Sequence, residues 1–203
     1  FVRISEIPFE SETRMMTVFA KSKNGEIKAF VKGAPDVILE KCSYILTDNG
    51  EFPLTSAMKK EILSVCNEFS DDALRVIAFA DKISPDTKET DSGLIFLGFM
   101  GMYDAPRDEA KKAIKLCKKA GIKTVMITGD HPRTAAAIAK QAGITGFMRN
   151  SDVITGEELA KMSENELYSK IPEISVFARV SPADKLKIVR AFKKRGHIVA
   201  MTG

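Results

Sequence analysis

The sequence predicts an α/β chain in two parts: an antiparallel α+β part, followed by a parallel, doubly wound part. In the first part, short apolar segments flank Asn24–Gly25 and Asn49–Gly50, two typical β-hairpin turns. In the second part, apolar segments alternate with segments of helical periodicity, the pattern of a parallel sheet with crossover helices. The polar stretch 84–93, SPDTKETDSG, separates the two patterns and is the natural boundary between them.

Composition excludes several classes of protein. The 203 residues carry a net charge of only +4, and the basic residues are scattered, so a nucleic-acid partner is not expected. No apolar run approaches the ~18–20 residues that span a membrane. The three cysteines form no CxxC pair, which favours buried thiols in a reduced, cytoplasmic compartment. Because the chain opens at Phe1 without a signal peptide and stops at Gly203, we expect a piece of a longer protein.

Local signals in the first part predict two hairpins, two helices and a further strand. A helix capped by Thr55 is expected to bury one stripe of side chains, and the stripe comprises Met58, Ile62, Val65, Cys66 and Phe69. The expected segments are strands 15–20, 26–31, 43–47, 51–54 and 74–80, and helices 34–42 and 55–69.

The second part is predicted to alternate strands 94–100, 122–127, 174–180 and 197–201 with helices 107–120, 132–142 and 181–195. The first of these helices carries Ala110, Ala113, Ile114 and Cys117 at the spacing of a core face. Two capping boxes, Thr155 with Glu158 and Ser163 with Glu166, predict short helices in an insertion.

Polar side chains follow the predicted parallel strands, where open α/β sheets bind their ligands. These candidates are Asp104, Arg107, Thr128, Gly129, Asp130, Arg179, Lys185, Thr202 and Gly203. Hydroxyls, backbone N–H groups and a lysine suit a phosphoryl group, and glycine permits a close backbone approach. Asp104 and Asp130 could instead cap the helices that follow them, and Lys185 could be a solvated lysine of a first helical turn.

A second group of candidates lies in the first part and comprises Phe9, Arg14, Lys32, Gly33 and Arg75. An aromatic ring with several cations could hold a nucleotide by stacking and by pairing with its phosphates. The alternatives are that Phe9 is a core residue, that Lys32 is solvated, and that Arg75 pairs with Asp71 or Asp72.

The motifs KGAPD, DAPR, MITGD, FARVSPADK and the terminal MTG, in this order and spacing, resemble the cytoplasmic headpiece of P-type cation-transporting ATPases, and the calcium pumps most of all. The resemblance covers essentially the whole chain. It implies that residues 1–98 are the later part of the nucleotide-binding domain. It also implies that residues 99–203 are most of a phosphorylation domain with a haloacid-dehalogenase-like Rossmann fold.

The resemblance also implies roles for residues of the first part and of the segment after it. Phe9 matches the residue that stacks on adenine, Lys32 and its neighbour Gly33 the lysine motif of the nucleotide pocket, and Arg75 an arginine that reaches the ATP phosphates. Arg14 stands where the calcium pumps usually carry lysine, which keeps the charge but changes its geometry. Asp104 and Arg107 match a motif normally written Asp-Pro-Pro-Arg, in which Ala105 here replaces the first proline. By this match Arg107 is expected to bind the nucleotide and Asp104 to have a structural or hinge role.

At the strand ends of the second part, Thr128, Gly129 and Asp130 match the TGD motif beside the phosphoryl site. Lys185 matches the lysine that holds the transferring phosphate. Thr202 and Gly203 match the start of the hinge motif TGDGVND.

Two motifs of the family are not in these 203 residues: DKTGTLT, with its phosphorylated aspartate, and the acids after Thr-Gly, one of which binds magnesium. We therefore expect a headpiece that binds ATP at most, with Mg²⁺ held in the full-length pump by residues outside this chain. The implied partners are the actuator and transmembrane domains of the same polypeptide, at a membrane, and the isolated chain could dimerise. The alternatives are a soluble dehalogenase-like phosphatase, which would need its own DxD nucleophile, and a non-catalytic nucleotide-binding module. The transported ion, expected to be calcium, is not encoded in this segment.

Overall fold

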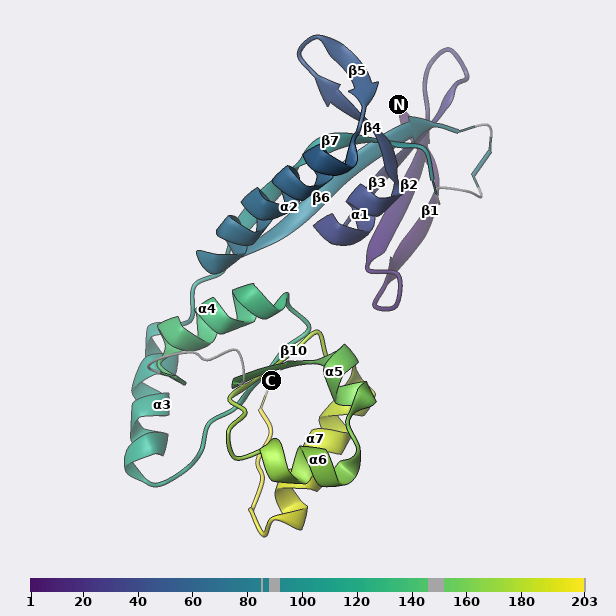
Figure 1. Cartoon of the computed structure of the whole chain (residues 1–203). Coiled ribbons are helices and arrows are strands. Elements are labelled where there is room, and N and C mark those ends of the chain that lie inside the picture. The colour runs from purple at the N-terminus through teal and green to yellow at the C-terminus, as the bar shows by residue number, and fades with distance from the viewer. Residues whose placement is uncertain (85, 88–91, 146–151, 203) are drawn as a thin grey trace. The chain divides into compact units, whose positions relative to one another are not determined.

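The computed structural model describes residues 1–84, 86–87, 92–145 and 152–202 (Figure 1). The chain forms two compact units. The first unit comprises residues 1–69 and 76–102, and the second comprises residues 70–75 and 103–203. The chain therefore passes from one unit to the other after residues 69, 75 and 102. The first two residues of one long strand, Leu74 and Arg75, are counted in the second unit.

The first unit is built on a seven-stranded sheet in the order β1-β2-β3-β6-β7-β4-β5. Its strands are β1 (Val2–Glu10), β2 (Met15–Lys21), β3 (Ile27–Gly33), β4 (Cys42–Thr47), β5 (Gly50–Pro53), β6 (Leu74–Ile83) and β7 (Leu94–Tyr103). The two predicted hairpins are confirmed, since β2 pairs with β3 and β4 with β5 in antiparallel register. Gly25 and Gly50 have φ values of 88° and 111°, the left-handed backbone that these turns need.

The sheet is mixed rather than purely antiparallel, because β4 and β7 run parallel. The segment 94–100 was expected in the parallel sheet of the second part, and this expectation is wrong. It forms most of β7, which pairs with β4 through Cys42↔Leu94 and Ile45↔Phe96. The stretch 84–93 thus joins two neighbouring strands of one sheet, β6 and β7.

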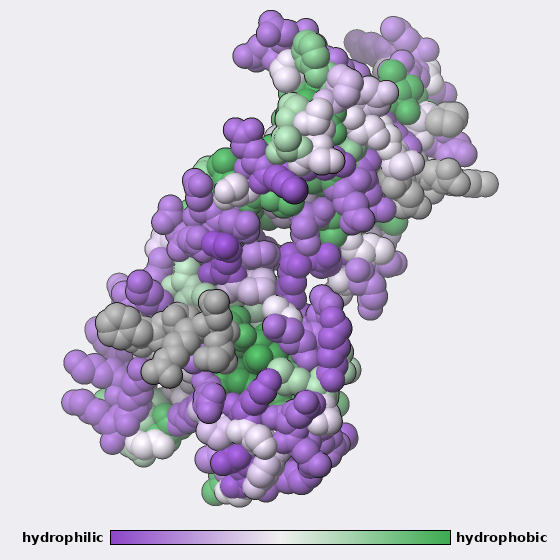
Figure 2. Space-filling model, in the orientation of Figure 1, coloured by the Kyte–Doolittle hydropathy of each residue, from purple (hydrophilic) through white to green (hydrophobic). Residues whose placement is uncertain are grey.

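Helices α1 (Pro35–Lys41) and α2 (Ser56–Asp71) cover one face of this sheet (Figure 1). Thr55 caps α2 as expected, accepting the Met58 N–H at 3.3 Å. Of the predicted stripe, Cys66 is buried, and Met58 and Ile62 pack against the core. Val65 and Phe69 remain more than a third exposed. The core buries side chains from both layers, and it comprises Met15, Val31, Ile38, Leu39, Cys42, Leu54, Ala78, Ala80, Leu94 and Phe96. Hydrophobic residues also reach the surface at the β4–β5 hairpin (Figure 2), where Tyr44, Leu46 and Phe52 are exposed.

The second unit contains a three-stranded parallel sheet in the order β8-β10-β9. Its strands are β8 (Met126–Ile127), β9 (Val153–Thr155) and β10 (Val176–Ala178), and its helices are α3 (Asp108–Lys119), α4 (Pro132–Ala142), α5 (Gly156–Lys161), α6 (Glu164–Lys170) and α7 (Pro182–Lys194). Small residues of α4 pack on Val176 and Ala178. Phe177, which points to the other face of the sheet, packs in the cluster formed by α5, α6 and α7. Helices on both faces of a parallel sheet are the arrangement that the strand–helix alternation predicted.

Two expectations for the second unit are wrong. Residues 197–201 form no strand with any described residue; Val199 packs against the core, while Ile198 is fully exposed. Helix α3 buries none of its residues, although its apolar positions follow core spacing. Periodicity marks which face is apolar, but a strand also needs a neighbour in register and a helix needs a covering layer. No helix among the described residues is both long and apolar enough to cross a membrane.

Candidate functional site

A tight turn at the carboxyl end of β8 carries Thr128, Gly129 and Asp130. The Thr128 hydroxyl donates to Asp130 Oδ2 at 2.7 Å and accepts the Asp130 backbone N–H at 3.1 Å. These two bonds fold the threonine and the aspartate onto each other, with both side chains only partly buried. Gly129 has open space where a Cβ would stand, so the turn leaves its backbone accessible on that side.

Arg179 lies beside this turn because β10 pairs with β8. The Arg179 N–H donates to the Asp130 carbonyl at 3.1 Å, and the Val180 N–H donates to the Thr128 carbonyl at 3.3 Å. Arg179 has φ +50°, a left-handed conformation that costs a non-glycine residue roughly 1 kcal/mol. The structure therefore brings three candidate residues together where two parallel strands end, Thr128 and Asp130 through their side chains and Arg179 through its backbone.

The segment 70–75 also contacts this part of the second unit. Arg75 Nε lies 3.8 Å from Asp130 Oδ1, and Arg133 donates to Asp71 Oδ2 at 2.7 Å. The alternative in which Arg75 pairs with Asp71 or Asp72 is therefore wrong. Buried Thr134, in the first turn of α4, donates its hydroxyl to the Leu74 carbonyl at 3.1 Å. The Arg75 guanidinium thus approaches Oδ1 of Asp130, the carboxylate oxygen to which Thr128 does not donate.

Asp130 is not the cap of α4, contrary to one of the two readings of the sequence. His131 is the N-cap residue, and its ring accepts the Arg133 N–H at 3.3 Å. Asp104 is not a cap either, since Arg107 occupies the N-cap position of α3 without a side-chain bond. The Asp130 carboxylate therefore remains available for Thr128 and for a cation.

The remaining candidates of the second unit are not joined to the turn by any hydrogen bond or ion pair within the part of the chain that the structure describes. Lys185 is half-buried in the first turn of α7, and no hydrogen bond or ion pair among the described residues links its ammonium to Thr128 or Asp130. Thr202 is exposed, and Gly203 lies outside the described residues. Asp104 and Arg107 are exposed in the segment after β7, a strand of the other sheet. Candidates from four strand ends of one sheet were expected to meet at this edge. The structure joins only those that follow β8 and β10.

The sequence analysis missed a third strand end, that of β9. Val153–Thr155 pairs in parallel with β10, and the segment continues directly into α5. The Thr155–Glu158 capping box is present as predicted, but it caps a helix that follows a strand of the sheet, not one in an insertion. The missed signal is the tripeptide Thr155-Gly156-Glu157, which repeats the Thr-Gly-acid pattern of residues 128–130.

In the first unit, register places Phe9 and Lys32 at the same end of the sheet. Phe9 lies in β1 next to the Glu10↔Met15 pair, and Lys32 on β3 pairs with Met16. Phe9 is 58% exposed, so it is not a core residue. Lys32 is also exposed, and it alternates with the residues that face α1 and α2, so it lies on the uncovered face of the sheet.

Arg14 and Gly33 meet in this region through a close backbone contact. The Ala34 N–H donates to the Arg14 carbonyl at 3.0 Å, and a Cβ on Gly33 would stand 2.5 Å from that oxygen. Arg14 has φ +54°, and its guanidinium donates to Asp36 Oδ2 at 3.0 Å. The predicted nucleotide residues of the first unit therefore form one surface region, with Arg14 turned toward α1 and Arg75 outside this unit.

Comparison with known proteins decides the family. Residues 1–109, over half of the chain, match the family model described as "P-type ATPase, cytoplasmic domain N". The chain belongs to the P-type cation ATPases. Calcium-transporting ATPase 1 of Bacillus cereus is 45% identical over 205 residues, which cover 99% of this chain and 23% of that protein. A calcium-transporting ATPase of Listeria monocytogenes is 42% identical over 209 residues, covering 100% of this chain and 23% of that protein.

The family includes pumps named for other ions. A sodium/potassium exporting P-type ATPase of Schizosaccharomyces pombe is 38% identical over 218 residues, covering 100% of this chain and 20% of its own length. The chain thus spans about a quarter of the length of the curated relatives it matches. The resemblance read from KGAPD, MITGD and FARVSPADK is confirmed at the level of the P-type cation ATPase family.

Proposed function

We propose that this chain is the ATP-handling headpiece of an ATP-driven pump that transports calcium, and that the pump works through an aspartyl-phosphate intermediate at a membrane. In this proposal the first unit binds the nucleotide, and the second unit, with a haloacid-dehalogenase-like fold, supplies one wall of the phosphoryl site. The actuator and transmembrane domains of the same polypeptide are the partners.

The observation that carries the proposal is the group formed by Thr128, Asp130 and Arg179 at the ends of two parallel strands. The Thr128 hydroxyl is already oriented by Asp130 at 2.7 Å, and the Arg179 backbone is tied to the same turn at 3.1 Å. A hydroxyl, the open backbone at Gly129 and a guanidinium are groups that can hold a phosphoryl oxygen in place. Whole-chain identity of 45% to a calcium-transporting ATPase supports the same assignment.

Each residue has a distinct role in this proposal. Thr128 has one hydroxyl proton, which it donates to Asp130 in this structure, and it would transfer that hydrogen bond to a phosphoryl oxygen when the group is bound. Lys185, in the first turn of α7, neutralises the charge of the transferring group from the next strand end. Thr202 is assigned to the same group, and Gly203, which belongs to the same motif, lies outside the described residues. Arg107 is assigned to nucleotide binding, and Asp104 to a structural or hinge role.

In the first unit, Phe9 stacks on the base, and Lys32 and Arg14 pair with phosphates. The exposed ring of Phe9 and the ammonium of Lys32 lie at one end of the sheet face opposite α1 and α2, the helices described in the first unit. Gly33 lets β3 approach Arg14, which brings the lysine and the arginine to the same edge. Arg75 is assigned to the phosphates as well, and its approach to Asp130 offers it an anionic partner when no nucleotide is bound.

Magnesium belongs to the proposed mechanism of the full-length pump. Among residues 1–84, 86–87, 92–145 and 152–202, no three His, Cys, Asp or Glu side chains gather as a metal-binding group. We therefore assign no step to the metal in this chain. When bound in the pump, it would screen the charge of the transferring phosphoryl group.

The nucleotide assignment is tested by titrating the ¹⁵N-labelled chain with ATP. Lys32→Ala is expected to weaken binding roughly tenfold, because one charge-assisted hydrogen bond contributes about 1.5 kcal/mol or more. Lys23→Ala is the matched control, since it removes the same charge from the exposed turn at the other end of the β2–β3 hairpin. Equal responses of the two variants and the unmodified chain would overturn the pocket assignment.

The phosphoryl-site assignment has a separate test. The 203 residues contain no DKTGTLT sequence, so incubation of the chain with γ-labelled ATP is expected to give no acid-stable phosphoenzyme. In the full-length pump, Thr128→Val is expected to lower the rate of phosphoenzyme formation while ATP binding to the first unit persists. Stable label on the isolated chain would show that a nucleophile exists within it.

A further inference from the structure

The unusual backbone of Arg179 is held from two sides. On one side, the N–H groups of Arg179 and Val180 donate to the carbonyls of Asp130 and Thr128. On the other side, the Arg179 carbonyl lies against the start of α5, where a Cβ built on Gly156 would collide with that oxygen. The same Cβ would stand 3.2 Å from the Arg179 carbonyl carbon and 3.3 Å from Val180 Cα. Space for the left-handed arginine therefore exists because residue 156 has no side chain.

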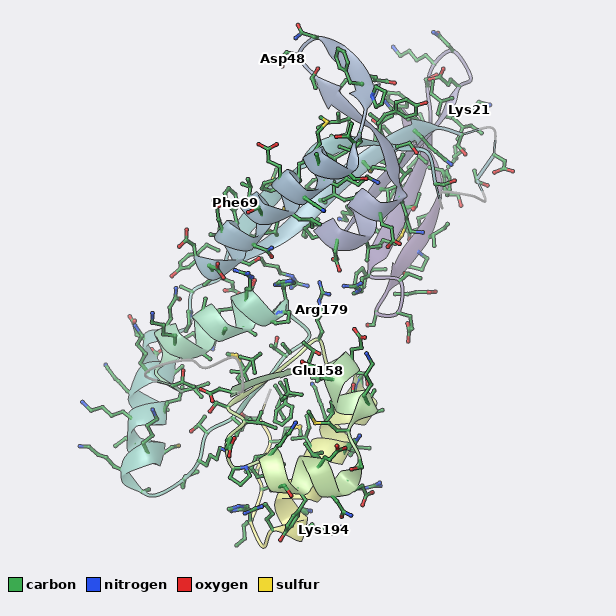
Figure 3. The ribbon with its side chains drawn as sticks, viewed as in Figure 1. Lys21, Asp48, Phe69, Glu158, Arg179 and Lys194 are labelled. Atoms are coloured by element: carbon green, nitrogen blue, oxygen red, sulfur yellow. The ribbon has the colours of Figure 1, made fainter. Side chains whose placement is uncertain are left out.

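Gly156 cannot easily move away from this contact. It is buried, and the capping box between Thr155 and Glu158 fixes the start of α5 around it. The neighbouring side chains of Ile154 and Leu159 belong to the core of the unit. The N-terminal end of α5 thus presents a rigid surface to Arg179, and Figure 3 labels Arg179 together with Glu158 of the adjoining first helical turn.

The chain on the far side of Arg179 is fixed as well. Ser181, two residues on, is the N-cap of α7 and forms a capping box with Asp184, in which the Ser181 hydroxyl accepts the Asp184 N–H at 3.3 Å. Arg179 therefore bends the chain between a paired strand and a capped helix, and both of these are held in place. A left-handed residue persists only when its surroundings determine it in this way.

We propose that Gly156 is a positioning residue for Arg179. By lacking a side chain it lets the Arg179 carbonyl rest on α5, which keeps Arg179 left-handed and sets the direction in which its side chain leaves the strand end beside Asp130. The importance of that direction for phosphoryl chemistry rests on the function proposed above, whereas the link between Gly156 and the Arg179 backbone does not.

The test is Gly156→Ala, read by the HN–Hα coupling and ¹³Cα shift of Arg179 in the labelled 203-residue chain. Both quantities report φ directly, so a general loss of stability does not imitate the effect. Gly143→Ala is the matched control. Gly143 has φ +80° and no atom within 4 Å of its Cβ position, so its variant is strained without touching Arg179. We expect the Arg179 coupling to change in Gly156→Ala and to stay unchanged in Gly143→Ala. An unchanged Arg179 coupling in Gly156→Ala overturns the proposal.

A second pair of variants covers the case in which Gly156→Ala does not fold. Arg179→Gly and Arg179→Ala both remove the charge, but only glycine adopts positive φ without cost. The glycine variant is expected to be the more stable of the two, and to tolerate Gly156→Ala better than the unmodified chain does. Equal stability of the two Arg179 variants contradicts the proposal.

Addition of ATP to the same samples tests the proposed phosphoryl site separately from the proposed role of Gly156. If ATP perturbs no amide of residues 128–130 or 179 in the unmodified chain, the proposed role of this edge in phosphoryl chemistry fails. The Arg179 coupling still decides the role of Gly156 in that case.

Discussion

Each unit of the molecule presents an arginine in the left-handed region of the backbone, and each packs that arginine's carbonyl against a glycine. Arg14 has φ +54° and rests on Gly33, while Arg179 has φ +50° and rests on Gly156. In the first unit Arg14 directly precedes β2 and Gly33 ends β3, and these two strands form one antiparallel hairpin in which Met15 pairs with Gly33. In the second unit they follow different strands of a parallel sheet, where Ala178 pairs with Thr155.

The arginine–glycine contact of the first unit is local, within one hairpin, whereas that of the second unit is tertiary and joins segments far apart in the sequence. A hairpin register is set by a short turn, so Arg14 meets Gly33 as soon as β2 pairs with β3. Parallel strands need long crossover connections, so Arg179 meets Gly156 only when β9 and β10 have paired across the segment that joins them. We therefore expect changes around Gly33 to act on the core of the first unit. Changes around Gly156 are expected to act on the geometry of the strand ends.

The largest expected contrast between the units is in thiol reactivity. Cys42 and Cys66 in the first unit are buried, and desolvation raises the pKa of each thiol to about 11, an effect that Lys59 partly offsets at Cys42. At pH 8 roughly one such thiol in a thousand is ionised, and only the thiolate reacts. Cys117, on helix α3 of the second unit, is only half-buried. Alkylation followed by mass spectrometry should modify Cys117 at least about 100-fold faster. Similar rates for all three would mean that the core of the first unit opens readily.

Gly33→Ala should give the largest loss of stability. The new Cβ would lie 2.5 Å from the Arg14 carbonyl and 2.9 Å from Met15 Cα, both of which are backbone atoms that cannot step aside. Overpacking of this kind costs about 2–3 kcal/mol of unfolding free energy. Urea denaturation measures it, with Gly129→Ala as the control because nothing lies within 4 Å of that Cβ position. Equal effects of the two substitutions would remove the packing argument for Gly33.

Thr155→Ala should have an intermediate effect that reaches the strand-end site. Loss of a capping hydroxyl costs about 1 kcal/mol, and this cap holds the start of α5 next to Arg179. Ser163→Ala removes the same kind of cap from α6. Both variants should lose similar stability in urea, but only Thr155→Ala should shift the Arg179 amide. A shift of equal size in Ser163→Ala would show that the effect is not local.

Asp36→Asn should have the smallest effect. It weakens the ion pair with Arg14, whose two side chains are 34% and 40% exposed, so solvent screening limits the loss to about 0.5 kcal/mol. ATP affinity of the chain should rise or stay constant, since Arg14 is released toward the nucleotide face. Isothermal titration with ATP provides the measurement, and a marked loss of affinity would indicate that Asp36 orients Arg14 for binding.

Features set by neighbouring residues could be predicted from the sequence. Both hairpin turns, the Thr55 cap and the two capping boxes were predictable, because glycine, asparagine and short hydroxyl side chains act within three or four residues. That Thr128, Asp130 and Arg179 lie close together could also be predicted, because the carboxyl ends of parallel strands share one edge of the sheet.

Features that depend on pairing between distant segments could not be predicted. The apolar segment of β7 looks the same in either sheet, and only its parallel register with β4 assigns it. The approach of Arg75 to Asp130 depends on where the segment 70–75 lies in the second unit. The contact of Gly156 with Arg179 could not be predicted, because the two residues are 23 positions apart and a glycine that starts a capped helix has no unusual local signal.

The two edges of the seven-stranded sheet differ in how they behave toward other chains in solution. At one edge, β5 has only four residues and ends at Pro53, which has no N–H to offer. At the other edge, β1 has nine residues, pairs among the described residues only with β2, and exposes Val2, Ile4 and Ile7. A long edge strand is the place where a second chain adds a strand most readily, and residues 2–7 of β1, which precede Pro8, contain no proline. Self-association of the purified chain at high concentration is therefore expected to begin at β1, and a lysine on that strand is the change that should keep the protein monomeric.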